Sequence, residues 1–193
     1  EDLLRISLEG EKVAHGKPSG VDNTIAVMGG TIVYRRGEKP VQVDARIPGG
    51  YKFLVADTGI KRSTRSVVEY VLKTAESIWD VAEHIYKAAD SIVERAVEAL
   101  TRGDVELLGK LMYVNHGLLV AMGASNATLD TLVNIARKAG ALGAKLTGAG
   151  WGGCMIALVR ESDADHVKIE LGRYASMVKV IDINVPGATI ETS

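Results

Sequence analysis

The sequence has very few cysteines, phenylalanines and prolines, and its charges nearly cancel. Its 193 residues include one cysteine, one phenylalanine and four prolines, and 23 basic against 24 acidic residues leave a formal net charge of −1. A single cysteine forms neither an internal disulfide nor a four-thiolate zinc site, which favours a reducing, cytoplasmic environment over secretion. A chain with so little net charge has no general attraction for nucleic acid or for an anionic membrane surface, so we expect neither as a partner.

Long hydrophobic runs are absent too. The longest, such as residues 154–159, are far shorter than the roughly 20 residues that a membrane-spanning helix requires. The sequence is nevertheless 47% hydrophobic and 24% charged, which excludes disorder and predicts a globular core. An initiator methionine and a signal segment are also lacking, and the first residues resemble the end of an amphipathic helix, so we expect the later part of a longer polypeptide.

Hydrophobic spacing predicts an α+β fold. Steps of three and four predict a long helix over residues 66–100 with a break near 83–90, a helix capped by Asp104 that runs to about 121, a third from Thr128 or Asp130 to about 140, and a fourth over 162–174. Short apolar or alternating runs predict a hairpin at 31–34 and 41–43 and strands at 51–56, 144–147, 154–159 and 178–185. The order strand, strand, helix, strand beneath several helices indicates an α/β sandwich of the ferredoxin-like kind.

The expected domain boundary is the run Pro48-Gly49-Gly50, which interrupts the regular pattern. It divides the chain into residues 1–47 and residues 51–193.

Four glycines gather in the segment TGAGWGG at residues 147–153. The spacing of Gly148, Gly150 and Gly153 is formally that of a dinucleotide fingerprint, but such a fingerprint opens a helix, and here a strand-like run follows at once. We therefore predict that the segment joins two strands, and that its glycines allow close approach to a ligand or to another loop. A tight hairpin without a ligand is the alternative.

The polar loop at residues 11–23 has the residue types that phosphoryl transfer needs. That reaction requires positioned donors and a carboxylate near the attacking hydroxyl group, a role open to Asp22. Glu11 is a candidate ligand for Mg²⁺, which usually takes one or two protein carboxylates and fills its other positions with water and phosphate. In the alternative interpretation, Asp22 caps a helix that starts at Asn23 and Glu11 is solvated.

A third segment, DTGIKRSTR at residues 57–65, places three cations and three hydroxyl groups at the start of the long helix. A carboxylate or phosphate would be stabilised there by the free amides of the helix N-terminus together with Arg62 or Arg65. The alternative is an N-capped helix whose arginines face solvent.

Three motifs in this order resemble the signature segments of the GHMP kinase superfamily, and most closely those of the archaeal-type mevalonate kinases. They are HGKPSGVDN at residues 15–23, DTGIKRSTR at residues 57–65 and KLTGAGWGGC at residues 145–154. The third departs from the family pattern at Trp151, where glycine is usual. The resemblance covers nearly all of this chain but only the later half of the family's length.

The resemblance implies a role for each matching residue. Asp22 would be the catalytic residue that acts on the substrate hydroxyl, and Glu11 would bind magnesium. His15, Arg62 and Thr64 would bind the substrate. The glycine loop would line the catalytic centre on the phosphate side, through Gly148, Ala149, Gly150, Gly152 and Gly153. Residues 1–47 would complete the nucleotide-side domain, and residues 51–193 would form the C-terminal domain.

The implied reaction is the ATP- and Mg²⁺-dependent phosphorylation of (R)-mevalonate to 5-phosphomevalonate in isoprenoid biosynthesis. The family's catalytic lysine and triphosphate-binding loop have no match in this sequence. We therefore expect an N-terminal half of the same enzyme as partner, and no activity from this chain alone. Homodimers are common in the family. The alternatives are another small-molecule kinase of the superfamily, acting on phosphomevalonate, a sugar or homoserine, or a non-catalytic fragment that binds a ligand or a partner protein.

Overall fold

The computed structural model describes residues 20–35, 37–183 and 185–189, which fall into two compact units. The first contains the described residues up to Arg46 and those from Asp182 onward, and the second is Ile47–Ile181. The sequence predicted one domain over residues 51–193, whereas the segment from Asp182 groups with the first unit. The reason is backbone pairing: the Gly30 amide donates to the Val185 carbonyl at 2.8 Å, and the Ala188 amide to the Ala26 carbonyl at 3.1 Å.

The first unit contains helix α2 (Val21–Met28) and strands β1 (Thr31–Val33) and β2 (Val41–Val43). The two strands pair antiparallel, which confirms the predicted hairpin. At the end of α2, Gly29 has a φ of 66°, and a Cβ atom there would overlap the backbone of Gly187. This close approach fixes the C-terminal segment against the helix end.

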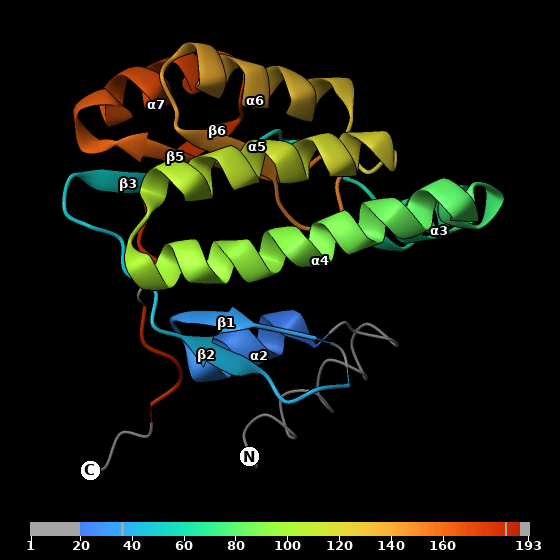
Figure 1. The fold of residues 1–193 in the computed structure, drawn as a ribbon. Helices are drawn as coiled ribbons and strands as arrows, with labels where there is room; N and C mark the ends of the chain where they lie inside the picture. Colours follow the sequence, from blue (N-terminus) through green and yellow to red (C-terminus); the bar gives the residue numbers. More distant parts are fainter. Residues whose placement is uncertain (1–19, 36, 184, 190–193) are drawn as a thin grey trace. The chain divides into compact units, whose positions relative to one another are not determined.

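The second unit is built on a four-stranded antiparallel sheet with the strand order β4-β5-β3-β6 (Figure 1). The strands are β3 (Tyr51–Asp57), β4 (Gly143–Leu146), β5 (Cys154–Arg160) and β6 (Met177–Ile181). Because β3 comes first in the chain and lies between β5 and β6, the order is that of a ferredoxin-like sheet. The predicted α+β class is confirmed.

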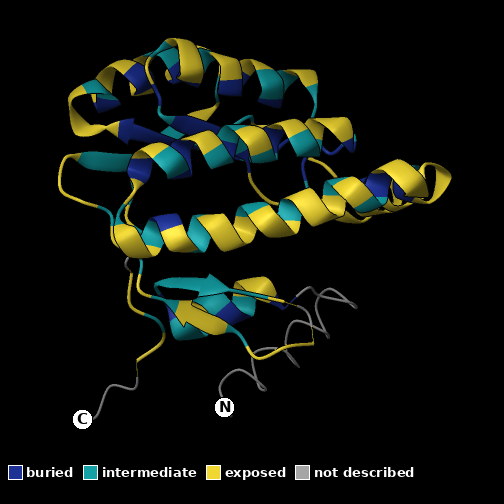
Figure 2. Ribbon diagram, viewed as in Figure 1, coloured by how far each residue is buried: buried dark blue, intermediate teal, exposed yellow. Residues whose placement is uncertain are grey.

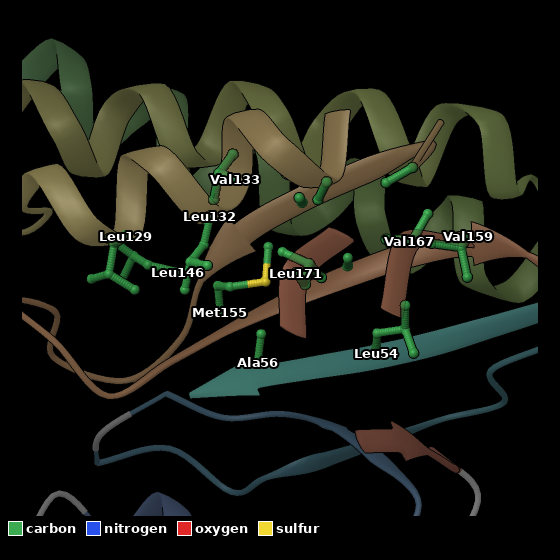
Figure 3. Packing of buried hydrophobic residues seen from close by; sticks show 14 of the residues in the cluster. Leu54, Ala56, Leu129, Leu132, Val133, Leu146, Met155, Val159, Val167 and Leu171 are labelled. Carbon is green, nitrogen blue, oxygen red and sulfur yellow. The ribbon is translucent and has the colours of Figure 1, made fainter. Parts of the chain in front are cut away.

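Two helices, α6 (Ala127–Lys138) and α7 (Ala164–Gly172), cover one face of this sheet (Figures 1 and 3). A short 3₁₀ turn, Glu161–Asp163, precedes α7. The main hydrophobic core lies between these helices and the sheet, and its largest side chains are at most 2% exposed: Leu54, Leu129, Leu132, Val133, Leu146, Met155, Val159, Val167 and Leu171. This packing fixes the ends of β4 and β5, from which the glycine-rich segment leaves the sheet.

Helix α5 (Val105–Ala121) packs along the edge strand β4. Asp104 caps it as predicted, accepting a hydrogen bond from the Leu107 amide at 3.0 Å. The contact is close because Gly109 and Gly143 face each other, and a Cβ atom on either would overlap backbone of the neighbouring element. The helix therefore covers the edge strand of the sheet.

The long helical region is broken at a different place from the one predicted. Helix α3 (Thr64–Ser77) ends and α4 (Trp79–Arg102) begins around Ile78, whose φ and ψ are −135° and 44°. The predicted break at residues 83–90 was wrong: α4 runs through them without interruption, and they contain neither glycine nor proline. Ala75 and Ala82, on the two sides of the break, belong to one small buried cluster with Met122.

The start of α6 also differs slightly from the prediction. Helix α6 begins at Ala127, earlier than the predicted Thr128 or Asp130, because the Asn126 side chain accepts a hydrogen bond from the Leu129 amide at 2.9 Å.

Helix α4 is largely exposed (Figure 2). Its fully buried residues are Ala82 and Ala99. It is the longest helix that the structure describes, at 24 residues, yet neither it nor any other described helix combines the length and the apolar character needed to cross a bilayer.

Candidate active site around the glycine loop

The segment 147–153, here called the glycine loop, connects β4 to β5 as a hairpin. The Thr147 amide donates to the Cys154 carbonyl at 2.9 Å and closes the antiparallel pair. A strand follows the loop, so the prediction that it joins two strands is confirmed and a helix-opening dinucleotide fingerprint is excluded.

The loop's glycines allow it to approach two other segments of the chain. Gly150 has a φ of 96°, and a Cβ atom there would overlap the carbonyl oxygen of Ala124, in the connection between α5 and α6. Gly152 has a φ of 141°, and its Cβ would lie 2.7 Å from the carbonyl oxygen of Ile60. Close packing against other loops therefore explains these glycines, as one of the sequence interpretations proposed.

Arg62 lies directly against the glycine loop. Its Nε donates to the Gly150 carbonyl at 3.0 Å. A Cβ atom on Gly153 would lie 2.8 Å from the guanidinium group, and one on Gly148 would lie 3.5 Å from it. The structure thus brings together four of the residues predicted for the site, and the glycines make room for the cation.

The segment before Arg62 is held in a defined shape by local hydrogen bonds. The Gly59 amide donates to Asp57 Oδ1 at 3.0 Å, and the Ile60 amide donates to Thr58 Oγ1 at 3.2 Å. The Thr58 amide donates to the Gly153 carbonyl at 2.9 Å. These Asx-type turns lead the chain from the end of β3 past the glycine loop and into α3.

The remaining residues of the motif at 57–65 lie at the N-terminus of α3. Ser63 caps the helix, because its Oγ accepts from the Ser66 amide at 3.3 Å. Thr64 is the first helical residue and is exposed. Arg65 pairs with Glu69 at 2.7 Å along the solvent-facing side of the helix. The interpretation as a capped helix with a solvent-facing arginine is therefore correct for Arg65, but Arg62 turns toward the loop.

A cavity of about 490 Å³ opens beside these contacts. Asp57, Lys61, Arg62 and Cys154 supply the titratable groups in its walls, and the other lining residues are Gly59, Ile60, Thr147, Gly148 and Gly153. Two cations and the backbone of a glycine loop are a combination that favours an anionic ligand such as a carboxylate or a phosphate.

Cys154, the first residue of β5, is half-buried in the wall of this cavity. Burial raises the pKa of its thiol above the usual value, the carboxylate of Asp57 raises it further, and Arg62 opposes both effects. The thiol therefore stays protonated near neutral pH, which argues against a nucleophilic role.

A buried histidine for which the sequence predicted no role holds the start of the glycine loop. His116 on α5 accepts the Leu146 amide through Nδ1 at 3.3 Å, and its Nε2 lies 3.2 Å from Oδ1 of Asp130. Ser125 Oγ donates to the same carboxylate oxygen at 2.5 Å. Leu146 is the last residue of β4, so this network fixes the point at which the chain enters the loop. Sequence spacing does not predict this network, because His116, Asp130 and Leu146 are far apart in the chain.

The protonation of this network is set by burial. Burial lowers the pKa of His116 below its usual value, with smaller contributions in the same direction from Lys145 and Arg137, while Asp130 opposes the shift. Burial also lowers the pKa of Lys145, whose Nζ donates to the Leu146 carbonyl at 2.9 Å. A neutral His116 keeps the Nδ1 lone pair that accepts the Leu146 amide.

Asp22 belongs to the first unit, where it is exposed in the first turn of α2. The helix starts at Val21 and its N-cap is Gly20, so the alternative in which Asp22 caps a helix starting at Asn23 is wrong. The amide and the hydroxyl of Thr24 both donate to the Gly20 carbonyl, which secures this turn. An acidic side chain here is favoured by the free amides of the helix end.

Two of the predicted site residues, Glu11 and His15, lie outside the described residues. Within the part of the chain that the structure describes, no group of three His, Cys, Asp or Glu residues is arranged to hold a metal ion.

Comparison with known proteins relates the chain to one family. Residues 96–175 match the family described as "GHMP kinases C terminal". The mevalonate kinase of Aeropyrum pernix is 49% identical over 191 residues, which are 99% of this chain and 59% of that protein. The mevalonate kinase of Thermococcus gammatolerans is 39% identical over 170 residues, 86% of this chain and 50% of that protein. The chain therefore spans about half the length of the curated relatives it matches.

A solved structure gives the same relationship. The crystal structure of L. major mevalonate kinase in complex with R-mevalonate matches 93% of this chain with a TM-score of 0.83 and 36% sequence identity, and the match covers 56% of that protein. The fold described above is thus shared with the corresponding part of that kinase.

Proposed function

Because the chain belongs to the GHMP kinase superfamily, we propose that it supplies the substrate side of a mevalonate kinase. The reaction is the transfer of the γ-phosphoryl group of ATP to the C5 hydroxyl of (R)-mevalonate. An N-terminal half of the same enzyme binds the nucleotide triphosphate, and this chain alone is inactive. The proposal extends to 5-phosphomevalonate as product and to a place in isoprenoid biosynthesis.

The observation that carries the proposal is the bond from Arg62 Nε to the Gly150 carbonyl at the wall of the cavity. Phosphoryl transfer depends on cations and backbone donors that are in position before the reaction, because reorganising them during the reaction is costly. Arg62 is held through Nε, so its two terminal nitrogens are presented together to the carboxylate or phosphate of a ligand. Lys61 adds a second positive charge to the same wall.

The other roles follow the motifs. We assign Asp22 to the substrate hydroxyl: an aspartate of ordinary basicity is a weak base toward an alcohol, so it orients the hydroxyl and accepts its hydrogen late in the transfer. Thr64 and His15 orient the acid together with Arg62. The carboxylate of Glu11 is a hard oxygen ligand of the kind that Mg²⁺ prefers, and the ion would neutralise charge on the phosphates. The glycine loop lines the phosphate side of the site.

The deciding experiment is to express this chain with and without a candidate upstream half and to measure ATP consumption with (R)-mevalonate. The proposal expects turnover from the combination and none from this chain alone. Phosphomevalonate, a sugar and homoserine serve as competing acceptors in the same assay. A clear preference for one of them would assign the protein to another branch of the superfamily, and no consumption with any acceptor would indicate a non-catalytic binding module.

A further inference from the structure

Trp151 occupies a backbone position that favours glycine. Among the described residues it is the one residue other than glycine with a positive φ, at 55°. A Cβ atom disfavours this left-handed conformation, and the neighbouring Gly150 and Gly152 also have positive φ values. Contacts of the indole must therefore offset the backbone cost of having a side chain here.

Those contacts join the glycine loop to two other elements. The indole Nε1 donates to the Gly123 carbonyl at 2.7 Å, and the Trp151 amide donates to the Ala124 carbonyl at 3.0 Å. The indole also packs on the ring of Tyr70 in α3, with 5.1 Å between centroids and 56° between planes. Gly123 makes room for this arrangement, because a Cβ atom there would lie 2.6 Å from Tyr70. The loop is thus tied to α3 and to the α5–α6 connection.

Gly150 and Trp151, at the centre of the glycine loop, both contact the segment that contains Arg62 and helix α3. Gly150 accepts from Arg62, just before α3 begins, and Trp151 packs on Tyr70, within that helix. A movement of α3 would therefore displace both contacts, and a movement of the loop would displace Arg62. The tryptophan connects the shape of the loop to the position of the cation in the cavity wall.

We propose that Trp151 is a positioning residue that orders the glycine loop before any ligand arrives and couples it to α3. A loop that is already ordered loses little conformational entropy when a ligand binds. Only the kinetic consequence rests on the proposed function: without the tryptophan, the phosphate donor must order the loop, which weakens its binding without slowing the chemical step.

The first test uses hydrogen exchange of the amides at residues 147–154 in this chain. The substitution Trp151→Phe keeps a ring but removes the Nε1 donor, and it should accelerate exchange about tenfold, as expected for the loss of one partly buried hydrogen bond. Tyr70→Leu keeps the donor and removes the stacked ring, and it should accelerate exchange by about fivefold. Trp151→Gly removes both contacts. Trp79→Phe is the matched control, since Trp79 is an exposed tryptophan of α4 that packs on Tyr86.

The proposal is overturned if Trp151→Phe and Tyr70→Leu both exchange at the rate of the unsubstituted chain. These two variants decide the matter even if Trp151→Gly fails to fold, because Trp151→Phe keeps an aromatic ring at position 151 and Tyr70→Leu leaves Trp151 unchanged.

The second test uses the assembled enzyme. Trp151→Phe should raise the KM for the phosphate donor about fivefold and leave kcat within about twofold, with Trp79→Phe unchanged. Faster exchange without a change in KM would reduce Trp151 to a structural residue and overturn its positioning role. If the unsubstituted assembly transfers no phosphoryl group at all, the proposed function fails, whereas the exchange experiment still decides whether Trp151 orders the loop.

Discussion

Arg62 Nε lies 3.0 Å from the carbonyl oxygen of Gly150, a residue 88 positions later in the chain. The bond joins the segment that follows β3 to the hairpin between β4 and β5. Four helices lie between that segment and this hairpin along the chain. It is possible because Gly153, which faces the guanidinium group, has no side chain. The cation is therefore fixed by tertiary structure and does not depend on a ligand for its position.

This geometry predicts that Arg62 is sensitive even to a conservative change. Arg62→Lys keeps the charge but cannot reproduce the Nε bond together with two terminal donors. We expect kcat/KM for (R)-mevalonate in the assembled enzyme to fall by about tenfold to a hundredfold, the range for a lost hydrogen bond to a charged group. Arg65→Gln is the matched control, because Arg65 pairs with Glu69 on the exposed side of α3. If the Arg62→Lys enzyme is as active as the control, Arg62 does not contribute to substrate binding in the way proposed.

Gly150→Ala should destabilise the second unit. The new Cβ would overlap the Ala124 carbonyl, and the φ of 96° is unfavourable for alanine. We expect the free energy of unfolding, measured by urea denaturation, to fall by about 2 kcal/mol or more. Gly117→Ala is the control: Gly117 lies in α5 with open space around its Cβ position, so the same change should stabilise the helix by about 1 kcal/mol. Equal stabilities for the two variants would contradict the observed packing.

His116 should make the stability of the protein depend on pH. Its pKa is lower in the folded state than its ordinary value of 6.5, mainly because of burial. The unfolded chain therefore binds the proton more readily, so the stabilising contribution is complete above pH 6.5 and is lost as the pH falls through the folded pKa. Protonation at Nδ1 also removes the acceptor for the Leu146 amide.

The measurement is the free energy of unfolding as a function of pH for the unsubstituted chain and for His116→Gln. Glutamine does not titrate and its carbonyl can accept the same amide, so the decrease below pH 6.5 should be smaller in this variant. Identical profiles for the chain and His116→Gln would show that another group titrates.

Much of the second unit could be predicted from sequence because its signals are local. The apolar run that begins at Cys154 excludes a helix directly after the glycine loop, and Asp104 marks the start of α5 by its capping side chain. The break at Ile78 has no such signal, because neither glycine nor proline marks it, and Ala75 and Ala82 on its two sides share a buried cluster with the distant Met122. The local sequence pattern therefore predicted which helices and strands exist better than it predicted the residues at which they begin and end.

The contacts that build the site could not be predicted in the same way. The motif suggested Arg62 as a ligand-binding residue, but nothing near it in sequence indicates Gly150 as its partner. The bond from the Leu146 amide to His116 joins residues 30 positions apart and depends on the close contact of Gly109 with Gly143. Such pairings are set by how elements pack, and a single sequence carries no period or spacing that records them.

The proposed function requires Asp22 for the phosphoryl transfer to (R)-mevalonate. The most direct test is the turnover of Asp22→Asn in the assembled enzyme, with the fold checked by its thermal unfolding. Asparagine has the same size but cannot accept the hydroxyl proton, so kcat should fall by at least about a hundredfold. Turnover close to that of the unsubstituted enzyme would contradict the claim.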